Sequence, residues 1–150
     1  MNWLQLAQEV IGGKVLNNEE ALAMLNSEDD ELLKLMDGAF AIRKHYYGKK
    51  VKLNMIMNAK SGYCPEDCGY CSQSSKSTAP IEKYPFITKD EILEGAKRAF
   101  ENRIGTYCIV ASGRGPTRKD VNTVSEAVTE IKDKYGLKVC ACLGILKEEQ

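Results

Sequence analysis

Three cysteines that fall within eight residues of this sequence are the side chains best suited to chemistry. Cys64, Cys68 and Cys71 have the spacing CxxxCxxC. Thiolates are the usual protein ligands of iron–sulfur clusters. Three of them can hold three irons of a cubane cluster and leave the fourth iron open to another molecule. The spacing therefore predicts a 4Fe–4S cluster with one open coordination position.

Other kinds of cysteine site fit this stretch less well. A structural zinc site usually has four ligands, commonly in CxxC-type pairs, and the only histidine, His45, is expected on a preceding helix. A ferredoxin-type site would add a nearby fourth cysteine followed by proline, which this stretch lacks. A disulfide framework is typical of secreted proteins, and the N-terminus lacks the basic start and apolar core of a signal peptide.

Composition argues against several classes of partner. The chain has 150 residues, and 21 basic residues balance 21 acidic ones. This balance gives no electrostatic reason to bind nucleic acid or an anionic membrane. No apolar run approaches the roughly 18–20 residues needed to cross a bilayer. We therefore expect a cytoplasmic protein that binds neither nucleic acid nor membrane.

The sequence around the cysteines predicts strands that alternate with helices. The expected elements are strands at 51–58, 105–111 and 138–143, and helices from a capping box at Thr88–Glu91 and from about Arg118 to Gly136. The first helix is expected to turn Ile92, Ala96, Ala99 and Phe100 inward. Such alternation is typical of parallel βα units, which bind ligands at the carboxyl ends of their strands. The cysteine stretch follows the first strand and is therefore predicted at that edge.

Helices alone are expected in the first fifty residues. They run from Trp3 to Ile11, from 19 to 26 after a cap at Asn17 or Asn18, and from near Asp29 to Gly48. The third has an apolar stripe of Leu32, Leu33, Leu35, Met36, Phe40 and Ile42. At the other end of the chain, residues 146–150 look like the beginning of another helix.

With Tyr70 directly before its third cysteine, the CxxxCxxC stretch resembles the radical S-adenosylmethionine enzymes. In that superfamily the open iron chelates S-adenosylmethionine, and an electron from the cluster cleaves it to methionine and a 5′-deoxyadenosyl radical. The resemblance implies that Cys64, Cys68 and Cys71 hold the 4Fe–4S cluster. It also implies that the cofactor, S-adenosylmethionine, is contacted by Tyr70, Ser112 and Gly113.

Cysteines later in the chain narrow the resemblance. Cys108 lies in the second expected strand, and Cys140 and Cys142 share one face of the third. The resemblance to the biotin synthase family is carried by Tyr63–Ser74, Tyr107–Pro116 and Gly136–Gly144. It implies a 2Fe–2S cluster held in part by Cys108 and Cys140. Cys142 is not a ligand position of that family and is expected to pack in the strand.

The resemblance also implies an activity and an architecture. The activity is sulfur insertion into dethiobiotin, with a flavodoxin- or ferredoxin-like electron donor and a homodimeric enzyme. The fold class is α/β, a TIM-type (β/α)8 barrel that needs about 250 residues. Residues 1–50 would be a helical extension, and residues 51–150 would supply about three βα units. The third 2Fe–2S cysteine, an arginine ligand and the substrate-binding residues are expected beyond Gln150, so the chain alone is expected to be inactive. It is also expected to fold poorly alone, because the edge of its third strand has no fourth strand to cover it.

Two other functions stay open at this point. Another radical S-adenosylmethionine enzyme, such as a hydrogenase-maturation or thiamine-pathway relative, would share the cysteine stretch but need not place cysteines at 108 and 140. A non-enzymatic iron–sulfur or metal-binding module would need only the three clustered thiolates.

Overall fold

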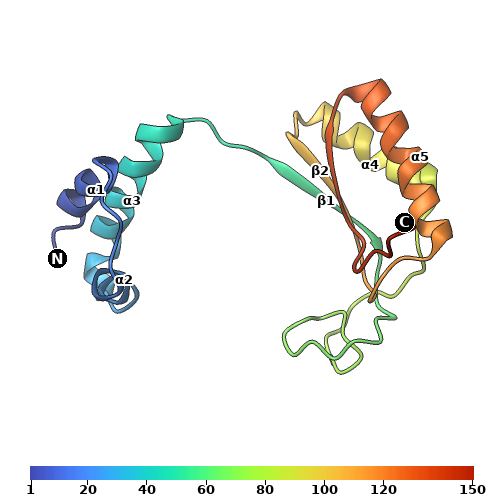
Figure 1. The fold of residues 1–150 in the computed structure, drawn as a ribbon, viewed down its shortest axis with the longest axis horizontal. Coiled ribbons are helices and arrows are strands. Elements are labelled where there is room, and N and C mark those ends of the chain that lie inside the picture. The colour runs from blue at the N-terminus through green and yellow to red at the C-terminus, as the bar shows by residue number, and fades with distance from the viewer. The chain divides into compact units, whose positions relative to one another are not determined.

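The computed structural model describes all 150 residues, and they divide into two compact units, Met1–Val51 and Lys52–Gln150. The first contains only helices, and the second contains three strands that alternate with helices (Figure 1). We call them the helical unit and the α/β unit.

The helical unit is held together by packing of its first helix on its last. Its elements are α1 (Trp3–Ile11), α2 (Asn18–Leu25), a 3₁₀ turn (Asp29–Glu31) and α3 (Leu32–Tyr47). Trp3 is buried, and its indole N–H donates a hydrogen bond of 3.0 Å to the carboxylate of Glu31. A side chain at Gly38 of α3 would come within 2.8 Å of the Trp3 carbonyl oxygen. Glycine is therefore required there for α1 and α3 to approach each other.

The expected apolar stripe of α3 is only partly buried. The helix forms and ends at Gly48 as predicted. Leu33 is 77% exposed, Met36 58% and Phe40 50%. The prediction of the helix is confirmed, and much of its apolar stripe is exposed.

The α/β unit is built on a parallel sheet with strand order β1-β2-β3. Its elements are β1 (Asn54–Lys60), α4 (Lys89–Glu101), β2 (Thr106–Ala111), α5 (Arg118–Tyr135) and β3 (Lys138–Cys142). Both helices lie on the same face of the sheet (Figure 1). The predicted α/β class with parallel βα units is thereby confirmed.

Strand alternation divides the side chains of the sheet between two faces. One face packs on α4 and α5 and forms the core with Ala59, Tyr107, Ile109, Ile92, Ala96, Ala99, Val124, Ala127 and Ile131. The other, which we call the open face, carries Asn54, Ile56, Asn58, Cys108, Val110, Lys138, Cys140 and Cys142. Apolar side chains therefore fix the helix side of the sheet, and the later cysteines lie on the face that the helices leave free.

Most of the predicted elements have the expected boundaries, but three expectations about the start of the first strand, the burial of Phe100 and the end of the chain need correction. The first strand begins at Asn54, not Val51, because β2 offers register partners only from Thr106 onward. Phe100 is 50% exposed and leans on the ring of Tyr135, with centroids 5.2 Å apart. Residues 146–150 form a turn and no helix, since five residues close too few helical hydrogen bonds.

The predicted caps of α4 and α5 are present. Thr88 and Glu91 form the expected capping box, and a second box joins Thr117 to Asp120 at the start of α5. Gly136 ends α5 in the left-handed conformation that favours glycine. None of the helices combines the length and apolar composition needed to cross a lipid bilayer.

Candidate metal centre

The segment 61–87, which we call the cysteine loop, leaves the carboxyl end of β1 and returns to its own base before α4. Ser61 and Tyr84 exchange backbone hydrogen bonds of 3.2 and 3.1 Å. The amide of Ile87 donates to the carbonyl of Ala59 at 2.8 Å. The Tyr84 hydroxyl donates to the carbonyl of Asn58 at 3.0 Å. The base of the loop is therefore fixed to the strand.

Gln73 ties the interior of the loop to that base. Its side-chain oxygen accepts hydrogen bonds from the amide of Gly62 and from the hydroxyl of Ser61. The chain turns into the loop at Gly62 and Tyr63, whose φ angles are 69° and 54°. Sequence reasoning missed the role of Gln73. The sequence feature that could have indicated this role is an amide side chain two residues after the third cysteine, since its oxygen can accept hydrogen bonds from backbone N–H groups.

The three clustered cysteines lie on this loop as free thiols. Cys68 is exposed, and Cys64 and Cys71 are partly buried. The amide of Cys71 donates to the carbonyl of Cys68 at 3.2 Å, so these two share a turn. No group of three potential ligand side chains lies close enough to hold one metal ion. The structure thus places the three cysteines on one loop and does not gather their sulfur atoms.

The donor set of the loop nevertheless fits a thiolate-bound cluster. It offers three free cysteines, one of which faces solvent. A preformed metal site rarely exists in an unfolded chain, and the free energy of metal binding contributes to folding of the ligand segment. A cavity of about 340 Å³ is lined by Cys68, Cys71 and their neighbours in the loop. The chemistry of the loop is therefore compatible with a cluster that assembles on it.

The turn after β2 is joined to the start of the cysteine loop through Ser112. Its amide donates to the carbonyl of Lys60 at 3.1 Å, and its hydroxyl donates to the carbonyl of Gly62. Gly113 has a φ of 133°, where a side chain would be strained. Tyr70 is 99% exposed. Of these three predicted cofactor contacts, Ser112 therefore has a clear structural role of its own.

A second group of thiols lies on the open face. Cys108 and Cys140 are register partners in the parallel pairing of β2 with β3. Partial burial, and then the neighbouring Cys140 thiol, raise the pKa of Cys108 above its ordinary value. Hydrogen bonding to Cys140 raises the pKa of Cys142, and the sulfur atoms of this pair are 3.7 Å apart. Cys142 shares the face of Cys140 as expected, but it is exposed. Its expected packing role stays a prediction, because the helices of this chain cover the other face of the sheet.

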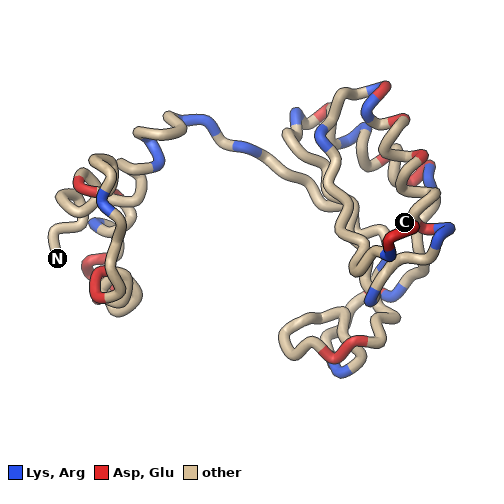
Figure 2. The backbone as a smooth tube through the Cα atoms, in the orientation of Figure 1, with Lys and Arg blue, Asp and Glu red and all other residues tan.

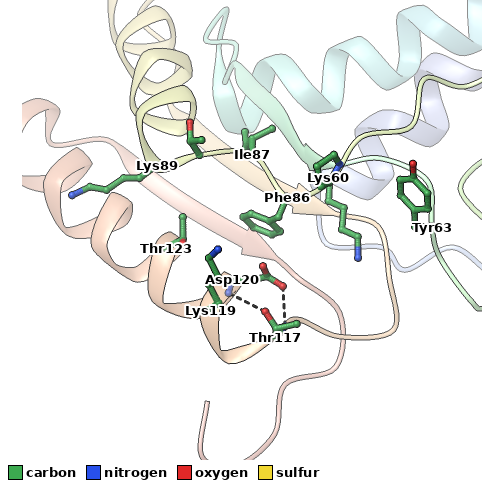
Figure 3. A pocket seen from close by; sticks show the side chains of 11 residues that line it. Lys60, Tyr63, Phe86, Ile87, Lys89, Thr117, Lys119, Asp120 and Thr123 are labelled. Atoms are coloured by element: carbon green, nitrogen blue, oxygen red, sulfur yellow. Dashed lines mark hydrogen bonds between the residues drawn. The ribbon is translucent and has the colours of Figure 1, made fainter.

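A cavity of about 610 Å³ in the α/β unit is lined in part by the base of the cysteine loop, and none of its lining residues is a cysteine. Figure 3 shows its lining by Lys60 and Tyr63 and by the first turns of α4 and α5. Lys89 pairs with Glu130 at 3.0 Å. The Thr117 capping box closes one side. Size alone does not mark the metal centre, because the donor atoms lie elsewhere.

Charges of both signs are mixed on the α/β unit. Figure 2 shows basic and acidic residues interspersed along α4 and α5. Across the base of the cysteine loop, Arg114 forms an ion pair with Glu66 at 3.3 Å. Both side chains are substantially exposed, and such pairs contribute little to stability. The observed distribution therefore adds no reason to expect a polyanionic partner.

Known proteins similar to this chain include several biotin synthases. The chain is 89% identical over all 150 residues to that of Lysinibacillus sphaericus and 73% identical over 150 residues to that of Halalkalibacterium halodurans. It is 64% identical over 148 residues to that of Bacillus subtilis strain 168. These matches cover 99–100% of the chain but only 44–45% of each relative. The chain thus spans a little under half the length of these curated relatives.

Solved structures that share the fold include the following one. It is HydG, a maturase of the [FeFe]-hydrogenase, which matches 93% of this chain and 31% of its own chain with a TM-score of 0.63. Its identity of 23% supports likeness of fold only. No family model matches the sequence. From the relatives at 64–89% identity, the resemblance of this chain to the biotin synthase family is confirmed along its whole length.

Proposed function

We propose that this chain is part of a radical S-adenosylmethionine enzyme that inserts sulfur into dethiobiotin to give biotin. The observation that carries the proposal is 89% identity to a biotin synthase over all 150 residues. Free CxxxCxxC thiols at the carboxyl end of β1 support it, since parallel α/β folds bind ligands at that edge. Because the chain spans 45% of that relative, the proposal concerns an enzyme that contains this segment.

Cys64, Cys68 and Cys71 would hold a 4Fe–4S cluster. When bound, such a cluster supplies the electron that cleaves S-adenosylmethionine. The loop contributes three thiols and no fourth, which leaves one iron for the cofactor. Cys68 is exposed, so the site is accessible from solvent. The ties between Gln73 and the loop base would limit how far the cysteines travel as they converge.

Ser112, Gly113 and Tyr70 would contact S-adenosylmethionine. The bond from Ser112 to Gly62 would keep the turn after β2 in register with the cysteine loop. Gly113 has no side chain to block approach to its backbone. Tyr70 is fully exposed beside Cys71, so its ring is free to cover a bound ligand.

Cys108 and Cys140 would hold part of a 2Fe–2S cluster that serves as the sulfur donor. Their register pairing on adjacent strands of the open face supports this role. The remaining ligands, a third cysteine and an arginine, would come from residues beyond this chain. The substrate, dethiobiotin, would bind on the same side of the sheet, because donor sulfur and acceptor carbon must meet.

Residues 1–50 would form a helical extension, and residues 51–150 would form the first part of a radical S-adenosylmethionine barrel. The longer enzyme would be a homodimer that receives electrons from a flavodoxin- or ferredoxin-like donor. Six free cysteines favour a reducing compartment, the cytoplasm.

A chimaera would test the activity. This chain would replace the matching residues of the Lysinibacillus sphaericus biotin synthase, and biotin would be measured anaerobically with dethiobiotin, S-adenosylmethionine and a reductant. The chimaera should form biotin, and Cys71→Ser should abolish formation. Ser72→Ala, beside the ligand, is the matched control and should retain it. A folded chimaera that makes 5′-deoxyadenosine but no biotin would instead indicate another radical S-adenosylmethionine reaction.

Cluster content separates the two sets of ligands. After anaerobic reconstitution with iron and sulfide, Mössbauer spectra of the chimaera should show both cluster types. Cys108→Ala or Cys140→Ala should remove the 2Fe–2S signal and leave the 4Fe–4S signal. Survival of both signals would refute the assignment of Cys108 and Cys140. A colourless protein that holds only zinc would favour the non-enzymatic metal-binding module.

A further inference from the structure

The turn after β3 lies directly against the turn after β2, with backbone packed on backbone. The amide of Ile145 donates a hydrogen bond of 2.8 Å to the carbonyl of Arg114. A Cβ atom at Gly144 would lie 2.6 Å from the oxygen and 2.9 Å from the carbon of that carbonyl group. A Cβ atom at Gly115 would overlap the carbonyl oxygen of Ile145. Glycine at both positions is therefore required for the two turns to approach this closely.

The turn after β2 is fixed on its other side to the cysteine loop. The Ser112 amide donates to the carbonyl of Lys60, and the Ser112 hydroxyl donates to the carbonyl of Gly62. The loops that follow β1, β2 and β3 are thus joined in series at the carboxyl edge of the sheet. All of these contacts lie within this chain, so they do not depend on what covers the open face.

We propose that Gly144 is a positioning residue for S-adenosylmethionine, because it lets the turn after β3 hold Ser112 and Gly113 in place. This inference rests on the proposed function, in which Ser112 and Gly113 contact that cofactor. Gly144 has a φ of 94°, a conformation that favours glycine. Both its backbone conformation and its contact with Arg114 therefore exclude a side chain.

An added methyl group at Gly144 would displace the turn after β2 rather than the end of β3. Leu143 precedes Gly144 and is buried in the core, which holds the end of β3. Arg114, on the other side of the contact, has an exposed side chain. Since Gly113 precedes Arg114 directly, it would move with the displaced carbonyl group. The strain would then reach the hydrogen bonds that Ser112 makes with the cysteine loop.

Binding of S-adenosylmethionine to the reconstituted chimaera would test this role. Gly144→Ala should weaken binding more than about tenfold, the loss expected from one hydrogen bond to a charged ligand group. Gly115→Ala should weaken it as well, because its Cβ enters the same contact from the turn after β2 and its φ is not positive. Gly136→Ala is the matched control for strain. Its φ is 62° but no atom lies within 4 Å of the added Cβ, so binding should match the parent.

The readout is the change that S-adenosylmethionine causes in the electron paramagnetic resonance spectrum of the reduced chimaera, followed as a titration. A merely structural role for Gly144 would lower the urea midpoint and leave this titration unchanged. Parent-like affinity in both Gly144→Ala and Gly115→Ala would overturn the proposal. An equal loss in Gly136→Ala would also overturn it, because backbone strain alone would then explain the effect. A parent chimaera that binds no S-adenosylmethionine would instead contradict the proposed function, so the two failures are distinct.

Discussion

Replacing Gly95 with alanine should destabilise the α/β unit, although alanine is the better helix former. Gly95 is buried in the middle of α4. A Cβ atom there would overlap the hydroxyl oxygen of Tyr107 and the terminal methyl group of Met57. The Tyr107 hydroxyl cannot simply move aside, because it donates to the carbonyl of Ile92 at 3.0 Å in a fully buried position.

The magnitude follows from three opposing contributions. Alanine gains about 1 kcal/mol over glycine in a helix interior. Overpacking a core costs about 1–3 kcal/mol. Displacing the hydrogen bond from Tyr107 to Ile92 costs about 1 kcal/mol. Gly95→Ala should therefore lower the free energy of unfolding by about 1–3 kcal/mol. It should also disturb Cys108, because β2 carries Tyr107 next to it.

Urea unfolding of the chimaera, followed by far-ultraviolet circular dichroism, measures this effect. Gly69→Ala is the matched control, since a Cβ there meets no atom within 4 Å. Gly95→Ala that equals or exceeds the parent in stability would refute the packing argument.

Three further perturbations test other parts of the α/β unit. Thr106→Val should raise the free energy of unfolding by about 1 kcal/mol, because the buried Thr106 hydroxyl has no hydrogen-bond partner. The urea midpoint should rise accordingly, and an unchanged midpoint would contradict this. Gln73→Ala should speed limited proteolysis of the cysteine loop roughly fivefold, since the hydrogen bond from the Gly62 amide alone is worth about 1 kcal/mol. An unaltered cleavage rate would show that Gln73 does not hold the loop. Burial raises the pKa of Tyr107 to about 12, against about 10 in an unfolded chain. The stability that depends on the neutral Tyr107 phenol is therefore complete below pH 10 and is lost as the pH rises to 12. Spectrophotometric titration of the parent and of Tyr107→Phe checks this, and the late-ionising phenol should be absent from the variant.

Local patterns of sequence determined most of the α/β unit. The capping box at Thr88–Glu91 and the left-handed glycine at Gly136 fixed helix ends that the structure reproduces. Alternation along β3 put Cys140 and Cys142 on one face. These signals depend on hydrogen bonds and side-chain directions within a few residues, so they can be predicted without knowing the rest of the fold. The CxxxCxxC spacing is also a local pattern, and it predicts a metal site without knowledge of the rest of the fold.

Tertiary structure decided what depends on partners far apart in the sequence. The start of β1 at Asn54 follows from where β2 begins. The link from Ser112 to Gly62 joins residues 50 positions apart and ties two loops together. The exposure of Cys142 depends on which face α4 and α5 cover. Such contacts are set by packing between elements far apart in the sequence, so no local pattern could show that Cys142 is exposed in this chain, with its sulfur atom 3.7 Å from that of Cys140.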